Sequence, residues 1–208
     1  MLFAEFIARQ ARRPSGPFGW LLAKIGIAES AGANQAALEL IDLRRKDHVL
    51  EIGFGHGRTT GLAAAIATRG LVAGVDTSPL MLRVARRHNA EPIREGRVDL
   101  RLSDGVHLPF DDGAFDKVFS VHTLHFWPDP KATLEDIHRV MKRGGRLALG
   151  FHAADDGVMP ERYPPSVYRF HTREQVGKWL EGAGFTAVRV ERREDAGNAP
   201  SWAVARKP

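Results

Sequence analysis

The stretch 49-VLEIGFGHGRTT-60 decides the fold of this chain. A short apolar run that contains Glu51 leads directly into Gly53, Gly55 and Gly57. Glycine lets a backbone turn sharply, and it lets a ligand contact the main chain because no Cβ stands in the way. The stretch therefore predicts a buried strand, a tight turn and a helix. A turn that holds a ligand and a bare strand-to-helix turn both fit this pattern.

Strand-like and helix-like segments alternate along the rest of the chain. The N-terminal region reads as helical, and the expected strands are residues 49–52, 71–76, 97–104, 115–121 and 146–151. The expected helices are residues 58–68, 78–89, 129–142 and 172–184. The segments FTAVRVERR and SWAVARK then read as two final strands in a hairpin relation. Such alternation predicts an α/β fold with right-handed crossovers and a mostly parallel sheet covered on both faces.

Capping residues support the helix boundaries. Ser78 before Pro79 is typical of a helix start, and Thr172 with Gln175 has the spacing of a capping box. Glycines are expected to stop two of the helices: Gly70 for the helix that begins at residue 58, and the pair at 144 and 145 for the helix that begins at residue 129.

The composition indicates a soluble globular domain. The chain has 208 residues, of which 43% are hydrophobic and 26% charged, and it contains no cysteine. Disulfides, zinc–thiolate sites and thiol nucleophiles are therefore excluded. We expect no membrane span, because no apolar run approaches about 18 residues. We also expect no signal peptide in MLFAEFIARQARR, since acid and base interrupt its apolar residues, and we therefore expect a cytoplasmic protein.

The formal net charge of +5 raises the question of a polyanionic partner. A basic protein can bind nucleic acid or an anionic membrane. Here acids are interleaved with the arginines, and no run of like charge reaches the length of an interaction tail. We therefore expect no nucleic-acid partner.

Polar residues follow each expected strand, at the edge of the sheet where ligands of such folds bind. Asp76, about twenty positions beyond the glycines, is placed either to accept hydrogen bonds from both ribose hydroxyls or to cap a helix. Asp104 could accept from an exocyclic amine with Val106 over the ring, or it could simply form an Asp-Gly turn. A dinucleotide-binding turn would need a third glycine at position 58, where the chain has Arg58, and this argues against a nicotinamide cofactor.

Taken together, these motifs resemble the class I S-adenosylmethionine-dependent methyltransferases of the methyltransferase domain 11/25 type. The resemblance covers roughly residues 45–151 and comprises E-x-G-x-G-x-G, V-D-x-S, S-D-G and the run PFDDGAFDKVFSVHTLHFWPDPKATLEDIHRVMKRGGRLAL. It implies a three-layer α/β/α sandwich whose seven-stranded sheet has the order 3-2-1-4-5-7-6, with the last strand antiparallel. It further implies one domain over residues 1–208, with a helical cap or lid at 1–44, a cofactor core at 45–151, and an acceptor-side loop and closing helix–hairpin at 152–208.

The resemblance implies the cofactor S-adenosylmethionine and the product S-adenosylhomocysteine. The glycines would lie against its methionine and ribose parts, with Glu51 supporting the amino-acid end. Asp76 would bind the ribose, and Asp104 the adenine amine. The full set of implied cofactor contacts is Glu51, Gly53, Phe54, Gly55, Gly57, Asp76, Thr77, Ser78, Met81, Ser103, Asp104, Gly105, Val106, Ser120, Val121 and His122.

Methyl transfer by in-line displacement mainly requires that the acceptor atom is aligned with the S–CH₃ bond, and such alignment can lower the activation barrier by about 7–11 kcal/mol. A general base adds about 10²–10⁴-fold where the acceptor must lose a proton. Histidine is the natural base near neutral pH, and we rank His125 first, then His122, then His152. These histidines could equally do no more than shape the pocket. We expect no metal, because no ligand set is locally complete.

The acceptor pocket is expected to draw on residues 1–44 and 152–172 as well as the loop after the fourth strand. Its candidate wall residues are Phe18, Trp20, Trp127, Met159, Tyr163 and Tyr168, although packing of a structural lid would explain them equally. The first thirteen residues could form a short basic amphipathic helix, because Leu2, Phe3, Phe6 and Ile7 lie near Arg9, Arg12 and Arg13. Membrane contact and a lipid or amphiphile acceptor therefore stay open as an alternative. A protein that binds S-adenosylmethionine without transferring a methyl group is a further alternative. The acceptor is expected to be a small molecule, with its O, N or C atom open, and the protein a monomer or homodimer.

Overall fold

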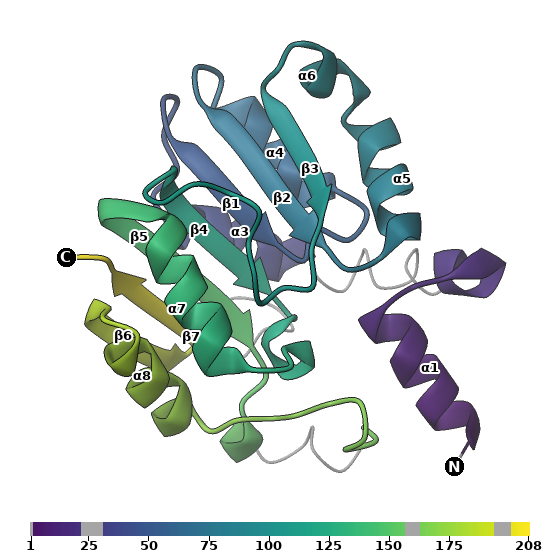
Figure 1. Cartoon of the computed structure of the whole chain (residues 1–208). Coiled ribbons are helices and arrows are strands. Elements are labelled where there is room, and N and C mark those ends of the chain that lie inside the picture. The colour runs from purple at the N-terminus through teal and green to yellow at the C-terminus, as the bar shows by residue number, and fades with distance from the viewer. Residues whose placement is uncertain (1, 22–30, 157–162, 194–200) are drawn as a thin grey trace.

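A computed structural model describes residues 2–21, 31–156, 163–193 and 201–208 of the chain. It contains one seven-stranded sheet of order β3-β2-β1-β4-β5-β7-β6, in which β7 runs antiparallel to its neighbours β5 and β6 (Figure 1). The order and the antiparallel strand confirm the prediction. The strands are β1 (His48–Ile52), β2 (Leu71–Asp76), β3 (Val98–Leu102), β4 (Phe115–Val121), β5 (Met141–Phe151), β6 (Thr186–Arg192) and β7 (Ser201–Arg206).

Helices cover both faces of the sheet, with α7 and α8 in front and α3 and α4 behind in the view of Figure 1. The helices are α1 (Leu2–Arg12), α3 (Ala31–Leu40), α4 (Arg58–Ile66), α5 (Pro79–His88), α6 (Ala90–Arg94), α7 (Pro130–Val140) and α8 (Arg173–Gly182), with two 3-10 turns, η1 (Leu124–Phe126) and η2 (Ala154–Asp156). None of these described helices is both long and apolar enough to cross a lipid bilayer.

Two hydrophobic cores form because successive strand residues face opposite sides of the sheet. Val49 of β1 lies in the core that α3, α4 and α5 complete, whereas its neighbour Leu50 lies in the core that α7 and α8 complete. Both side chains are fully buried. This alternation yields the three layers, and it leaves the carboxyl ends of the parallel strands free to carry polar side chains at one edge.

The predicted helix caps are confirmed. The Ser78 hydroxyl accepts a hydrogen bond from the Met81 amide at 3.2 Å, at the start of α5. At the start of α8 the Gln175 amide donates to the Thr172 hydroxyl at 3.2 Å, and the Thr172 amide donates to the Gln175 side chain at 3.0 Å. These contacts satisfy amide groups that have no partner inside the first turn of a helix.

The prediction that Gly70, Gly144 and Gly145 end helices is wrong, because each helix ends several residues earlier. The helix α7 ends at Val140, because Met141 is already extended (φ −79°, ψ 146°), and Gly144 and Gly145 lie inside β5. The helix α4 ends at Ile66, with Ala67 as its cap. A side chain at Gly70 would collide with the Asp47 carbonyl oxygen, so close backbone approach explains that glycine. The short helix α6 was not expected from the sequence.

Candidate functional site

A cavity of about 420 Å³ opens at the carboxyl ends of β1, β2, β3 and β4. This volume lies in the range of small-molecule sites. The residues that follow each of these strands line the cavity, together with parts of the N-terminal segment, α3 and the segment 163–170. The cavity therefore lies at the edge of the sheet where the sequence predicts a ligand.

The turn after β1 requires glycine at three positions. The φ angles of Gly53, Gly55 and Gly57 are 81°, 52° and 77°, in the left-handed region that residues with a Cβ rarely adopt. A Cβ at Gly55 would meet nothing within 4 Å, and Gly55 lines the cavity, so this stretch of main chain is open to a ligand. A Cβ at Gly57 would instead lie 2.6 Å from Ala85 Cβ. The third glycine therefore allows α5 to pack closely and does not line the cavity.

Glu51 is a buried acid in the cavity lining. Its side chain is 5% exposed, and its carboxyl oxygen accepts a hydrogen bond of 2.5 Å from the Thr60 hydroxyl. Burial raises the pKa of Glu51 from 4.5 to about 8, which the Thr60 hydrogen bond only partly opposes. A cation that enters the cavity beside Glu51 would favour the ionised carboxylate.

Asp76 joins the glycine turn to the start of α5. One carboxylate oxygen accepts from the Gly55 amide at 2.8 Å, and the other accepts from the Ser78 amide at 2.8 Å. Burial raises the pKa of Asp76, and these backbone hydrogen bonds oppose that rise. A carboxylate has about four lone-pair sites. Asp76 lines the cavity, so it retains capacity for two further donors there.

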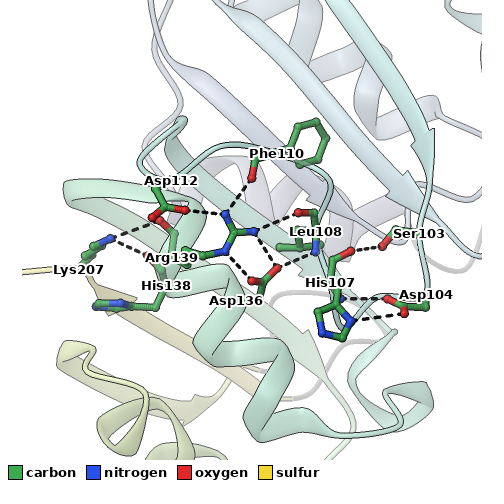
Figure 2. Close-up of polar contacts among 10 residues, drawn as sticks. All are labelled: Ser103, Asp104, His107, Leu108, Phe110, Asp112, Asp136, His138, Arg139 and Lys207. Atoms are coloured by element: carbon green, nitrogen blue, oxygen red, sulfur yellow. Dashed lines mark hydrogen bonds and ion pairs between the residues drawn. The ribbon is translucent and has the colours of Figure 1, made fainter.

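The loop after β3 is shaped by its own side chains (Figure 2). The Ser103 hydroxyl donates to the His107 carbonyl oxygen at 2.9 Å. One oxygen of Asp104 accepts from the amides of Val106 at 2.9 Å and His107 at 3.0 Å. These two hydrogen bonds hold the pKa of Asp104 below its ordinary value, so the carboxylate is ionised at neutral pH. Ser103, Asp104 and Gly105 line the cavity.

Three histidines line the cavity after β4 and β5. His122 has a left-handed backbone (φ 58°), and its ring stacks on that of His152 at 5.0 Å. His125 is 6% exposed. Burial lowers the pKa of His122 to about 4 and that of His125 to about 3, and it also lowers the pKa of His152. All three rings are therefore neutral at pH 7, and each Nδ1 is buried with no hydrogen-bond partner in the described part of the chain.

An aromatic wall stands beside His125. Tyr168 packs on the His125 ring at 5.1 Å, on Phe170 at 5.9 Å and on Tyr163 at 4.6 Å, and the planes of the Tyr168 and Phe170 rings are nearly parallel at 6°. The Arg169 amide donates to the His125 carbonyl oxygen at 3.0 Å, which ties this segment to η1. We call Tyr163, Tyr168 and Phe170 the aromatic wall.

Most of the residues singled out from the sequence line this one cavity. They are Glu51, Gly53, Phe54, Gly55, Asp76, Thr77, Met81, Ser103, Asp104, Gly105, Val121, His122, His125, Trp127, His152, Tyr163 and Tyr168. Their roles as ligands, wall or base stay predictions, and so does the division of the chain at residues 44 and 151.

Six described candidates stand outside the lining: Gly57, Ser78, Val106, Ser120, Phe18 and Trp20. Ser120 is buried, and its hydroxyl donates to the Ile52 carbonyl oxygen at 2.8 Å. Ser78 caps α5, and Val106 donates its amide to Asp104. Phe18 packs on Phe6 at 5.3 Å. Met159 lies outside the described residues.

The cavity also has lining residues that sequence reasoning missed: Ala11, Arg12, Pro14, Asn34, Ile52, His56, Thr59, Val75, Thr123, Phe126, Pro128 and Phe170. Thr123, Phe126 and Pro128 belong to the loop after β4, whose aromatic composition was the available signal. The sequence predicts that residues 1–44 contribute to the pocket, but it singles out Phe18 and Trp20 and not these N-terminal lining residues. They reach the cavity because Arg13 Nε donates to the Thr77 carbonyl oxygen at 3.0 Å and the Ser78 hydroxyl donates to the Pro14 carbonyl oxygen at 2.6 Å.

Residues 50–149 match a family model described as a methyltransferase domain. Over these residues the chain is therefore similar to the methyltransferase domain family. The chain is 39% identical over 105 residues to demethylmenaquinone methyltransferase of Symbiobacterium thermophilum, and the match covers 50% of this chain and 42% of that protein. It is 33% identical over 129 residues to 27-O-demethylrifamycin SV methyltransferase of Amycolatopsis mediterranei, covering 59% of this chain and 47% of that protein. The chain thus spans about half the length of the curated relatives it matches.

Solved structures share the fold of this chain. A SAM-dependent methyltransferase from Aquifex aeolicus superposes with a TM-score of 0.69 at 23% identity, covering 88% of this chain and 96% of that one. The 4+2 cyclase SpnF superposes with a TM-score of 0.69 at 22% identity, covering 84% of this chain and 80% of that one. The same architecture therefore also occurs in a protein described as a cyclase, so the fold alone does not define the reaction.

Proposed function

We propose that this protein transfers a methyl group from S-adenosylmethionine to a small-molecule acceptor in the cytoplasm, leaving S-adenosylhomocysteine. One observation carries the proposal. The cavity joins an open glycine turn and three carboxyl side chains at the ends of β1, β2 and β3 to a wall of neutral imidazole and aromatic rings. The carboxyl half suits a polar, cationic cofactor, and the other half suits an uncharged acceptor.

The residues at the carboxyl half fit the cofactor. Glu51 is a buried acid with a raised pKa, and the ammonium group of the cofactor would favour its ionised form. Asp76 keeps lone pairs for the two ribose hydroxyls. The second Asp104 oxygen, which lies 3.7 Å from Nδ1 of the exposed His107 ring, keeps lone pairs for the adenine amine. When bound, the cofactor supplies a methyl group on a sulfonium cation. The backbone of Gly53 and Gly55 then fixes where that cofactor lies.

His125 is the first candidate for proton transfer, with His122 and His152 behind it. Because its pKa is about 3, the His125 ring is in its proton-accepting form over the whole physiological range. With Nδ1 buried, Nε2 is the ring nitrogen that an acceptor in the cavity can reach. A base with so low a pKa contributes near the lower end of the usual range of about 10²–10⁴-fold. Alignment of the acceptor is therefore the larger contribution of this protein.

The aromatic wall supports an acceptor with a flat apolar part. Tyr168 and Phe170 present parallel rings beside His125, and Trp127 lines the same cavity. Offset packing of an acceptor ring on such side chains contributes about 0.5–1.5 kcal/mol beyond the burial of apolar area. Phe18, Trp20 and Met159 stay predictions for the outer part of this pocket.

The test begins with calorimetric titration of the purified protein with S-adenosylmethionine and S-adenosylhomocysteine, with NAD as the negative control. We expect binding of both adenosyl compounds and none of NAD. Asp76→Ala should abolish this binding, whereas the matched control Asp99→Ala, which removes a surface ion pair on β3, should leave it unchanged. Absence of binding by the folded wild-type protein would refute the cofactor assignment.

Radiolabelled methyl transfer then tests the reaction itself. A panel of uncharged phenols, aliphatic alcohols and primary amines is offered with labelled S-adenosylmethionine. We expect label in ring-bearing acceptors. A protein that binds the cofactor yet labels no member of a broad panel would favour a cofactor-binding protein with another function.

A further inference from the structure

One arginine outside the cavity holds the loop that follows β3. Figure 2 shows the Arg139 side chain of α7 with every N–H donor of its guanidinium engaged. Nε donates to Asp136 at 2.7 Å, and Nη2 donates to Asp136 at 3.2 Å and to the Leu108 carbonyl oxygen at 3.0 Å. Nη1 donates to the Phe110 carbonyl oxygen at 2.9 Å and to Asp112 at 2.7 Å. Three of its four partners thus belong to the segment 108–112.

Asp136 completes this contact from the same helix. Its carboxylate accepts the Leu108 amide at 2.6 Å, so both main-chain polar groups of Leu108 are held from α7. Partial burial opposes ionisation of Asp136, yet the hydrogen bond from Arg139 holds its pKa below the ordinary value. The Asp112 arm is exposed to solvent, whereas only 16% of the Asp136 side chain is exposed. The pair Arg139–Asp136 is therefore the anchored part of the network.

The held segment continues directly into the cavity lining. Ser103 at the cavity donates to the His107 carbonyl oxygen, and residue 107 adjoins the clamped Leu108. Leu108 itself is buried in the core that α7 completes. The Asp104 carboxylate accepts the His107 amide, so its position depends on where residues 107 and 108 are held. One side of the loop is fixed by β3 and the other by α7.

We propose that Arg139, together with Asp136, is a positioning residue that sets the Asp104 carboxylate for recognition of the adenine amine. The inference rests on the proposed function. Arg139 lies outside the cavity lining and acts through the loop alone. Lysine cannot replace it, because a single ammonium cannot reach Asp136 and two carbonyl oxygens in the planar geometry of a guanidinium.

The experiment compares two ligands that differ at the adenine amine. S-adenosylhomocysteine and S-inosylhomocysteine, which has an oxo group in place of the amine, are titrated calorimetrically into wild type and Arg139→Lys. A hydrogen bond to a charged group predicts a wild-type preference of about tenfold to a hundredfold for the adenosyl ligand. In Arg139→Lys we expect this preference to fall at least about fivefold, because the acceptor oxygen loses its fixed position.

The preference ratio separates positioning from general loss of stability, which would weaken both ligands alike. Lys142→Met is the matched control, because it breaks the 2.8 Å ion pair of Lys142 with Asp116 near the same end of α7 without touching the loop. Its preference ratio should equal that of wild type. Asp136→Asn keeps an acceptor oxygen and removes the charge, and it should lower the ratio in the same direction as Arg139→Lys.

Each outcome bears on a distinct claim. A lowered ratio in Arg139→Lys and Asp136→Asn, with Lys142→Met unchanged, supports the positioning role. An unchanged ratio in both variants overturns it while leaving the proposed function standing, since wild type still binds. Wild type that binds neither ligand overturns the proposed function, and the positioning role with it.

Discussion

Burial of Glu51 should lower the free energy of unfolding of this protein by an amount that follows from the pKa of its carboxyl group. The side chain is 5% exposed, and burial raises its pKa from 4.5 to about 8. Below pH 4.5 both the folded and the unfolded protein hold the proton, so the carboxyl group costs nothing. As the pH rises, the unfolded chain releases the proton and the folded protein keeps it, so the folded state loses stability until the pH passes about 8.

Glu51→Gln removes this titration and keeps a side-chain oxygen to accept from the Thr60 hydroxyl. One pKa unit corresponds to about 1.4 kcal/mol, so the variant should gain on the order of 3 kcal/mol of stability over wild type between pH 4.5 and pH 7. The same substitution should weaken binding of S-adenosylmethionine, because a neutral amide does not pair with its ammonium group. Stability and binding are thus expected to change in opposite directions.

The assay is urea unfolding of both proteins at pH 4.5, 6, 7 and 8, without cofactor. The difference in unfolding free energy between variant and wild type isolates residue 51, since all other titrating groups are shared. Glu91→Gln, the same substitution at an exposed position on α6, is the matched control. A difference for Glu51→Gln that stays constant from pH 4.5 to pH 8 would refute the raised pKa of Glu51.

Three further predictions concern the rest of the site. Because the pKa of His125 is about 3, kcat/KM should show no loss from protonation of this ring between pH 8 and pH 5. The variant His125→Gln should lower kcat by about tenfold to a hundredfold without a change in cofactor Kd. A fall in wild-type kcat/KM with a midpoint near pH 6.5 that disappears in His125→Gln would contradict this prediction. Tyr168→Leu should raise KM for a ring-bearing acceptor by about threefold to tenfold and leave the cofactor Kd unchanged. Tyr168→Phe keeps the aromatic ring and should have the wild-type KM. Equal effects of the two substitutions on KM would exclude ring packing. Gly57→Ala should cost about 2 kcal/mol or more of stability, because at a φ of 77° its Cβ would lie 2.6 Å from Ala85 Cβ. The control Gly96→Ala has a similar φ of 72° but no neighbour within 4 Å of its Cβ, and it should cost about 1 kcal/mol. Equal melting temperatures of the two variants would contradict the packing argument.

Local patterns carry the parts of this protein that the sequence predicts well. The capping contacts of Ser78 and Thr172 involve neighbours within a few residues, so residue type and spacing suffice to predict them. Patterns that look equally local fail where a distant segment supplies the reason. Gly70 is explained by the carbonyl oxygen of Asp47, and the end of α7 by an extended Met141 that already pairs with β4.

The sequence by itself determined the order of elements and the strand ends at which polar residues would meet, because the chain rules of parallel sheets admit few arrangements. Only the tertiary structure decided which of those residues share the cavity and in what protonation state. Arg12 and Asn34 line it because the N-terminal segment and α3 come to lie beside loops far away in sequence. Burial, which decides the pKa of Glu51 and of His125, depends on every element packed around a side chain and cannot be read from its neighbours in the chain.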